Sequence, residues 1–174
     1  MTSLLEHRTR VIENLWALLK PVICSINDDG GTTPGGTTTP VGTTIPVGTT
    51  TTVKPAYFLS GSFRLGLVDE ASDIDMVIAA PSTCGSRLEI MQRLVTRLET
   101  VPDVTDLNFI SGARIPLIAC KYQNVEFDIT VAVVLKNKNN TNTFDLNSLE
   151  GIDEANEASL GGPRHTEYIL RHVK

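Results

Sequence analysis

The sequence predicts a single α/β (α+β) domain in which helices flank a mixed β-sheet. Segments with helical periodicity alternate along the chain with segments that have the two-residue periodicity of strands, as expected of a sheet covered by helices. A length of 174 residues suits one domain, and 41% hydrophobic side chains suffice for a buried core.

Two amphipathic helices are expected, at residues 3–26 and 86–99. Each begins with a serine followed three residues later by a glutamate, which is the pattern of a capping box. Pro21 is expected to kink or shorten the end of the first helix. The predicted apolar stripes are Leu4, Val11, Leu15, Leu18 and Val22 in the first helix, and Leu88, Met91, Val95 and Leu98 in the second.

Four strands are expected, and the last two form a hairpin. The strand patterns cover residues 56–59, 73–80, 115–122 and 125–134, with Gln123-Asn124 as the tight turn between the last two. A polar loop is predicted at 136–142. Short helices are predicted to close the chain, one before Gly161-Gly162-Pro163 and one at 164–173.

Residues 27–53 interrupt this alternation. The segment is nearly all Thr, Gly and Pro, with a rough T-T-x-P-V-G repeat. Such a composition lacks the side chains needed to bury a core and has no helical period. We therefore expect a disordered surface insertion within a domain that otherwise spans residues 1–174.

Charge and cysteine content limit what the chain can do alone. The formal net charge is -5, whereas proteins that grip RNA over a long stretch carry a basic surface. Extensive RNA contacts are therefore expected to come from elsewhere.

Cys24, Cys84 and Cys120 are widely spaced and match no zinc motif, so separate thiols in a reducing, intracellular compartment are expected. No apolar run is long enough to span a membrane.

Two aspartates begin the strand predicted at 73–80. Because strand side chains alternate, Asp73 and Asp75 point the same way, while Ile74, Met76 and Ile78 point into the core. Two neighbouring carboxylates repel each other, and a hard divalent cation such as Mg²⁺ removes that cost. Alone, such a pattern more often marks a turn or a cap.

A third carboxylate on the strand at 125–134 favours the metal interpretation. Glu126, Asp128 and Thr130 share the polar face of this strand, and an acidic residue within a strong strand is unfavourable without a partner. We assign Asp128 to the site and Glu126 to a solvent-facing edge. Asp73, Asp75 and Asp128 together would form a two-metal centre for phosphoryl transfer.

A Gly-Ser pair precedes the aspartates by ten residues. Gly61 lets the backbone approach a phosphate, and Ser62 adds a hydroxyl and an N–H, so the pair is a candidate phosphate cradle. Such a pair alone is usually only a turn. Arg64 lies in the same loop. Its side chain either contacts phosphate or forms a structural ion pair, and the sequence leaves both alternatives open.

These motifs resemble a known family. Residues 61–81 resemble the catalytic motif of poly(A) polymerases, within the DNA polymerase β-like nucleotidyltransferase superfamily, and read G-S-F-R-L-G-L-V-D-E-A-S-D-I-D-M-V-I-A-A-P. Residues 113–132 resemble the hairpin of the third carboxylate in that family. Residues 152–173 resemble the passage from the catalytic domain into the central domain. The insertion at 27–53 has no counterpart in this resemblance.

The resemblance implies a polymerase β-like fold and specific roles for the site residues. Asp73, Asp75 and Asp128 would bind Mg²⁺ or Mn²⁺, with Asp128 nearest the attacking 3′-hydroxyl, and Gly61 and Ser62 would contact the triphosphate. The implied reaction is template-independent transfer of AMP from ATP to an RNA 3′ end. Two positions depart from the family pattern: Ser60 stands where Phe is common, and Gly161-Gly162 stand where Asn-Gly is common.

The resemblance also implies parts that these residues do not include. Family enzymes hold the adenine and the primer with a central helical domain and a further RNA-binding domain, which are expected to be absent from this chain. A nuclear location, mRNA polyadenylation and contact with 3′-end processing factors are implied as well. Two alternatives stay open: another transferase of the superfamily, of the uridylyl-, CCA- or oligoadenylate-type, and a non-catalytic binding module.

Overall fold

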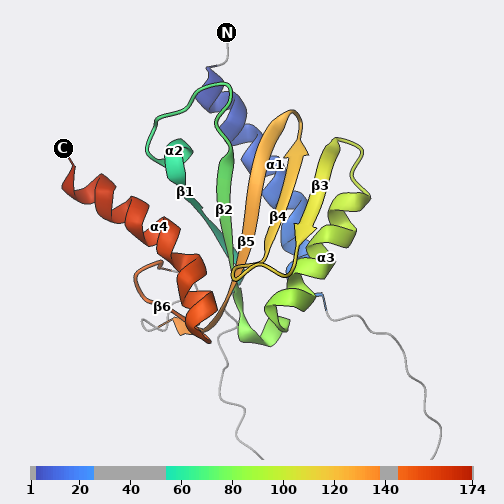
Figure 1. Ribbon diagram of the computed structural model, residues 1–174, viewed down its shortest axis with the longest axis vertical. Coiled ribbons are helices and arrows are strands. Elements are labelled where there is room, and N and C mark those ends of the chain that lie inside the picture. Colours follow the sequence, from blue (N-terminus) through green and yellow to red (C-terminus); the bar gives the residue numbers. More distant parts are fainter. Residues whose placement is uncertain (1–2, 26–53, 138–144, 174) are drawn as a thin grey trace, which may run out of the picture.

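The computed structural model describes residues 3–25, 54–137 and 145–173. The insertion predicted at 27–53 and residues 138–142 of the predicted polar loop lie outside these ranges. In the described ranges, the chain forms a twisted sheet with two long helices packed on one face and a third long helix on the opposite face (Figure 1).

The sheet is mixed, as predicted. Its strand order is β1-β2-β5-β4-β3, with the short β6 also paired to β5. β2 runs parallel to β5, and the other pairs are antiparallel. The strands are β1 (Ala56–Ser60), β2 (Ile74–Pro81), β3 (Val104–Ile110), β4 (Leu117–Tyr122), β5 (Val125–Asn137) and β6 (Leu149–Gly151).

Two of these strands, β3 and β6, were not predicted. β3 is an edge strand whose side chains are half-buried or exposed, and it is interrupted by an irregularity at which Asp106 has a φ of 53°. Because a central strand is covered on both faces and an edge strand is not, the hydrophobic signal of β3 is weak. β6 has only three residues, too few for a period.

Helices α1 (Leu4–Ile23) and α3 (Arg87–Glu99) cover one face of the sheet. Both predicted capping boxes are present, at Ser3 and Ser86. The predicted stripes were partly wrong, because Leu4 and Leu88 are exposed and other positions face the core. The buried hydrophobic rows are Val11, Ile12, Leu15, Leu19 and Ile23 in α1, and Ile90, Met91, Leu94 and Leu98 in α3.

A single helix, α4 (Glu154–His172), covers part of the other face. The prediction of two short helices was wrong, since α4 continues through Gly161-Gly162-Pro163. Leu160 and Pro163 are buried, and Leu160 packs with Val77 and Ala132 of the sheet. This burial offsets the poor helix propensity of the three residues, which no local pattern reveals.

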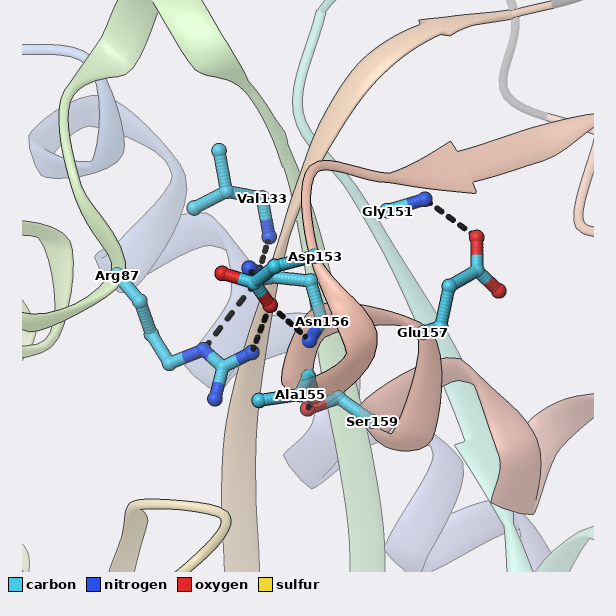
Figure 2. A network of polar contacts seen from close by, with 8 residues as sticks. All are labelled: Arg87, Val133, Gly151, Asp153, Ala155, Asn156, Glu157 and Ser159. Carbon is cyan, nitrogen blue, oxygen red and sulfur yellow. Dashed lines mark hydrogen bonds and ion pairs between the residues drawn. The ribbon is translucent and has the colours of Figure 1, made fainter.

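The first turn of α4 is tied to the sheet by one asparagine side chain (Figure 2). Asn156 Oδ1 accepts hydrogen bonds from the Val133 backbone N–H at 2.7 Å and from Arg87 Nε at 3.2 Å. Asp153 caps the helix by accepting from the Asn156 backbone N–H at 2.8 Å. These contacts join α4 to β5 and α3, and they fix where α4 lies on the sheet.

A disulfide between Cys24 and Cys84 joins the end of α1 to the 3₁₀ turn η1 (Ser82–Cys84) after β2. The expectation of three separate thiols was therefore wrong for this pair, because residues 60 positions apart become neighbours only on folding. Arg93 supports the junction by donating to the carbonyl oxygens of Ile23 and Cys84. Cys120 is a buried free thiol.

Reduction of this disulfide should lower the thermal unfolding midpoint by on the order of 10 °C, because the bond closes a long loop in the unfolded chain. Differential scanning fluorimetry with and without dithiothreitol measures the shift. Cys24→Ser should show the lower midpoint in both conditions. The expectation would be contradicted if the unfolding midpoint of the wild type did not change with dithiothreitol and equalled that of Cys24→Ser.

Candidate active site

Three carboxylates meet at the junction of the two central strands. Asp75 in β2 is paired in register with Asp128 in β5, and Asp73 lies one residue before β2. Oxygen atoms of all three side chains lie within 4.8 Å of one another. Asp73 is exposed, whereas Asp75 and Asp128 are half-buried. The three side chains are therefore close enough to share a metal ion.

Burial and neighbouring negative charge both act on the carboxyls of this cluster. Burial raises the pKa of the Asp75 carboxyl above its ordinary value, and the charge of Asp73 raises it further. Burial also raises the pKa of Asp128, followed by the charges of Asp73, Asp75 and Glu126. Carboxylate oxygens are the ligands that Mg²⁺ and Mn²⁺ prefer, so these residues fit a divalent cation that would neutralise them.

The Gly-Ser turn lies directly against this cluster. Gly61 begins the short helix α2 (Gly61–Arg64) with a φ of +68°, a left-handed conformation that favours glycine. A Cβ added at this position would lie 2.2 Å from Asp75 Oδ2. The missing side chain therefore lets the turn approach the carboxylate, and Ser62 follows in the same helix.

The loop that leads to Asp73 is held by a buried arginine of α1. Arg8 is 4% exposed, and its guanidinium donates to the carbonyl oxygens of Ser72 and of Glu70, the latter at 2.9 Å. Asp69 closes the same loop by accepting from the Ala71 backbone N–H at 3.0 Å. Sequence reasoning missed Arg8, although its spacing of three residues from Val11 and four from Ile12, both buried, places it on the inner side of α1.

Two other charged residues near the site have protein partners. Arg64 forms an ion pair of 2.6 Å with Glu167 of α4, so the guanidinium is turned toward that helix. Glu126 pairs with Lys121 across the β4–β5 hairpin at 3.1 Å and is largely exposed. Of the residues predicted for the site, the three aspartates and Gly61 lie together, while Arg64 lies at the edge toward α4.

Gly61→Ala should weaken divalent metal binding by about tenfold or more, since the new methyl group must displace the Asp75 carboxylate. Isothermal titration calorimetry with Mn²⁺ measures this loss. Gly66→Ala is the matched control, because Gly66 has a φ of +77° with open space around its Cβ position. Both variants should lose roughly 1–2 kcal/mol of stability from backbone strain. Equal metal affinities in the two variants would contradict the proposed contact.

The raised pKa values predict a pH-dependent stability. A carboxyl whose folded-state pKa is raised contributes stability that is fully present below its ordinary pKa and is lost as pH rises through the raised value. At neutral pH, Asp75→Asn should therefore raise the unfolding midpoint of the metal-free protein, and Mn²⁺ should raise that of the wild type. Both effects should fade as the pH falls below 4 in unfolding scans across pH, roughly the ordinary carboxyl pKa. Persistence of either effect at that pH would contradict this account.

Comparison with known proteins places this arrangement in a family. A model of the poly(A) polymerase nucleotidyltransferase domain matches residues 5–173. The poly(A) polymerase pla1 of Schizosaccharomyces pombe is 34% identical over 118 residues, which are 67% of this chain and 21% of that protein. The poly(A) polymerase of Entamoeba histolytica is 32% identical over 122 residues, or 68% of this chain and 23% of that protein.

Two further comparisons cover a similar share of this chain. Nuclear poly(A) polymerase 1 of Arabidopsis thaliana is 32% identical over 67% of this chain and 16% of its own length. The chain thus spans about a fifth of the length of the first two relatives and less of the third. A crystal structure of the Cid1 poly(U) polymerase has a TM-score of 0.48 and 16% identity, over 73% of this chain and 32% of that one.

The matched range includes the Gly-Ser turn, the mixed sheet and all three aspartates. The mixed sheet with flanking helices is the fold class expected from the sequence. No helix in the described parts of the chain has the length and apolar character needed to cross a membrane. This chain belongs to the family of poly(A) polymerase nucleotidyltransferase domains.

Proposed function

We propose that this chain carries the catalytic centre for transfer of AMP from ATP to an RNA 3′ end, with release of pyrophosphate. The observation that supports this most is the convergence of Asp73, Asp75 and Asp128 beside the Gly-Ser turn. A binding module has no need for three converging carboxylates, two of which have raised pKa values.

Each part of the site has a role in this proposal. Asp73, Asp75 and Asp128 hold Mg²⁺ or Mn²⁺, and Asp128 lies nearest the attacking 3′-hydroxyl. When bound, such cations supply Lewis-acid stabilisation of the triphosphate and activate the hydroxyl. Gly61 lets the triphosphate approach the backbone, and Ser62 offers its hydroxyl and N–H.

Arg64 is proposed to bind substrate once its ion pair with Glu167 is released or shared. Its guanidinium is held by Glu167 at 2.6 Å, so contact with a phosphate requires release or sharing of that ion pair. The charge of a triphosphate is larger than that of one carboxylate, and the arginine side chain is 47% exposed. Arg64 could therefore turn to the phosphates when nucleotide binds.

The remaining substrate contacts are proposed to come from other domains. The chain covers 16% to 23% of the three relatives, and its net charge of -5 is unsuited to a long RNA-binding surface. A central domain and an RNA-binding domain would hold the adenine and the primer. Contacts with 3′-end processing factors would also involve those parts.

A nuclear location is proposed together with mRNA polyadenylation. One relative is the nuclear poly(A) polymerase 1 of Arabidopsis thaliana. Because nuclear thiols are kept reduced, the Cys24–Cys84 bond would form there only under oxidising conditions.

Asp128→Asn should lower AMP transfer to a short oligoadenylate by about a thousandfold, because loss of a shared metal ligand removes several kcal/mol of transition-state stabilisation. Primer extension with ATP and Mn²⁺ measures the rate, and titration calorimetry of ATP with Mn²⁺ or with chelator measures binding. Glu126→Gln is the matched control, since Glu126 lies two residues away and pairs with Lys121.

Two results would count against the proposal. Near-normal transfer by Asp128→Asn would remove this aspartate from the site. Equal use of UTP and ATP by the wild type would favour a transferase of different base preference, because the three carboxylates do not read the base.

A further inference from the structure

A small cavity opens on the α4 side of the carboxylate cluster. Its volume is ≈ 180 Å³, and its wall includes two of the three carboxylates, Asp75 and Asp128. Ser60 at the end of β1 and Gly162 of α4 also line it, as do the apolar side chains of Ile115 and Leu117. A group bound there would lie next to the proposed reaction centre.

Ser60 is aimed into this cavity. It is paired in register with Asp75 across the antiparallel β1–β2 ladder, so the two side chains emerge on the same face of the sheet. Its Oγ would be 3.3 Å from a Cβ added at Gly162, so the hydroxyl points across the cavity toward α4. The glycine leaves the space in front of that hydroxyl open.

Ser60 is a buried residue whose hydroxyl has no hydrogen-bond partner among the described residues, and the residue lines the cavity. Ser60 is 8% exposed. A buried hydroxyl without a partner costs free energy, so most such groups in proteins are hydrogen-bonded to protein, water or ligand. Ser159, on the same cavity, shows the usual arrangement, because its hydroxyl donates to the Ala155 carbonyl at 3.0 Å.

The position of the cavity indicates which part of a substrate would reach it, given the proposed function on which this inference rests. In AMP transfer, the reacting phosphorus is bonded through one oxygen to the ribose of ATP. The attacking oxygen is itself a substituent of the terminal ribose of the RNA. On both sides of the reacting atom, the first group beyond the phosphate is therefore a ribose.

The lining suits a sugar. Ser60 and Thr130 offer hydroxyls, and Ile115 and Leu117 offer an apolar wall for the C–H groups of a furanose ring. Among the described residues Thr130, like Ser60, shows no side-chain hydrogen bond, and it lies two residues beyond Asp128 on the same face of β5. A hydroxyl that can both donate and accept is matched to the 2′- and 3′-hydroxyls of a ribose.

We propose that Ser60 is a ribose-binding residue of this site, and that its hydroxyl hydrogen-bonds a sugar hydroxyl next to the reacting phosphate. The sugar belongs either to the incoming nucleotide or to the last nucleotide of the RNA. Removal of this hydrogen bond lowers the preference for ribose over deoxyribose in whichever substrate it contacts. A specificity of this kind arises because a bound deoxy sugar would cover the Ser60 hydroxyl without giving it a hydrogen-bond partner.

The test compares Ser60→Ala with the wild type on matched substrate pairs. One arm uses ATP against 2′-deoxy-ATP and 3′-deoxy-ATP as donors, with Mn²⁺, and measures affinity by calorimetry and single-turnover transfer. The other arm uses ATP with oligoadenylates that end in ribose or in 2′-deoxyribose. For each protein, the affinity or transfer rate with the ribose substrate is divided by that with the deoxyribose substrate. This ratio should be roughly three- to tenfold lower for Ser60→Ala than for the wild type in one arm, which is the value of one hydrogen bond.

A control and a stability measurement separate binding from structure. Ser159→Ala removes a hydroxyl from the same cavity that already has a protein partner, and it should leave the sugar ratio unchanged. The unfolding midpoint of Ser60→Ala should not fall, because no protein hydrogen bond is lost. Equal weakening toward ribose and deoxyribose substrates, or an unchanged ratio in both arms, would overturn the role of Ser60.

The same experiment distinguishes this inference from the proposed function. A wild type that shows neither metal-dependent ATP binding nor transfer, also when it is joined to the domains that hold the adenine and the primer, would overturn both. A wild type that binds and transfers, with an unchanged sugar ratio in Ser60→Ala, would overturn the ribose contact alone and leave AMP transfer standing.

Discussion

The parallel pairing of β2 with β5 is the constraint on which the site depends. It places Asp75 directly beside Asp128 in the middle of the sheet, where apolar side chains on the opposite face keep both strands in register. A slip by one residue would turn every side chain of a strand to the other face. Core packing therefore holds these two carboxylates together, and burial raises the pKa of each, with the charge of Asp73 raising both further.

The elements around this pair complete the site from three directions. Arg8 reaches from α1 to the loop before Asp73, and Gly61 brings the Gly-Ser turn against Asp75. Asn156 fixes the first turn of α4 to β5, so that Gly162 faces Ser60 across the cavity. The buried guanidinium of Arg8, the missing side chain of Gly61 and the side-chain amide of Asn156 thus support the same site. They come from three separate parts of the sequence.

Much of the fold could be read from local pattern. The capping boxes at Ser3 and Ser86 marked both helix starts, and alternation marked β2 and β5. Errors occurred where long-range packing overrides local preference. α4 runs through Gly161-Gly162-Pro163 because burial of Leu160 compensates for poor propensity, and β3 was missed because an edge strand has little hydrophobic signal.

The sequence by itself determined the chemistry that is available: three aspartates, a Gly-Ser turn at the right spacing, and enough periodic apolar residues to form the central strands. These features depend on residue type and short-range order, which are local. Only the tertiary structure decided which side chains these residues contact. It brought Cys24 to Cys84, turned Arg64 toward Glu167, and buried Ser60 beside Asp75 without a hydrogen bond. Such contacts join residues distant in sequence, and only the packing of the whole domain selects them.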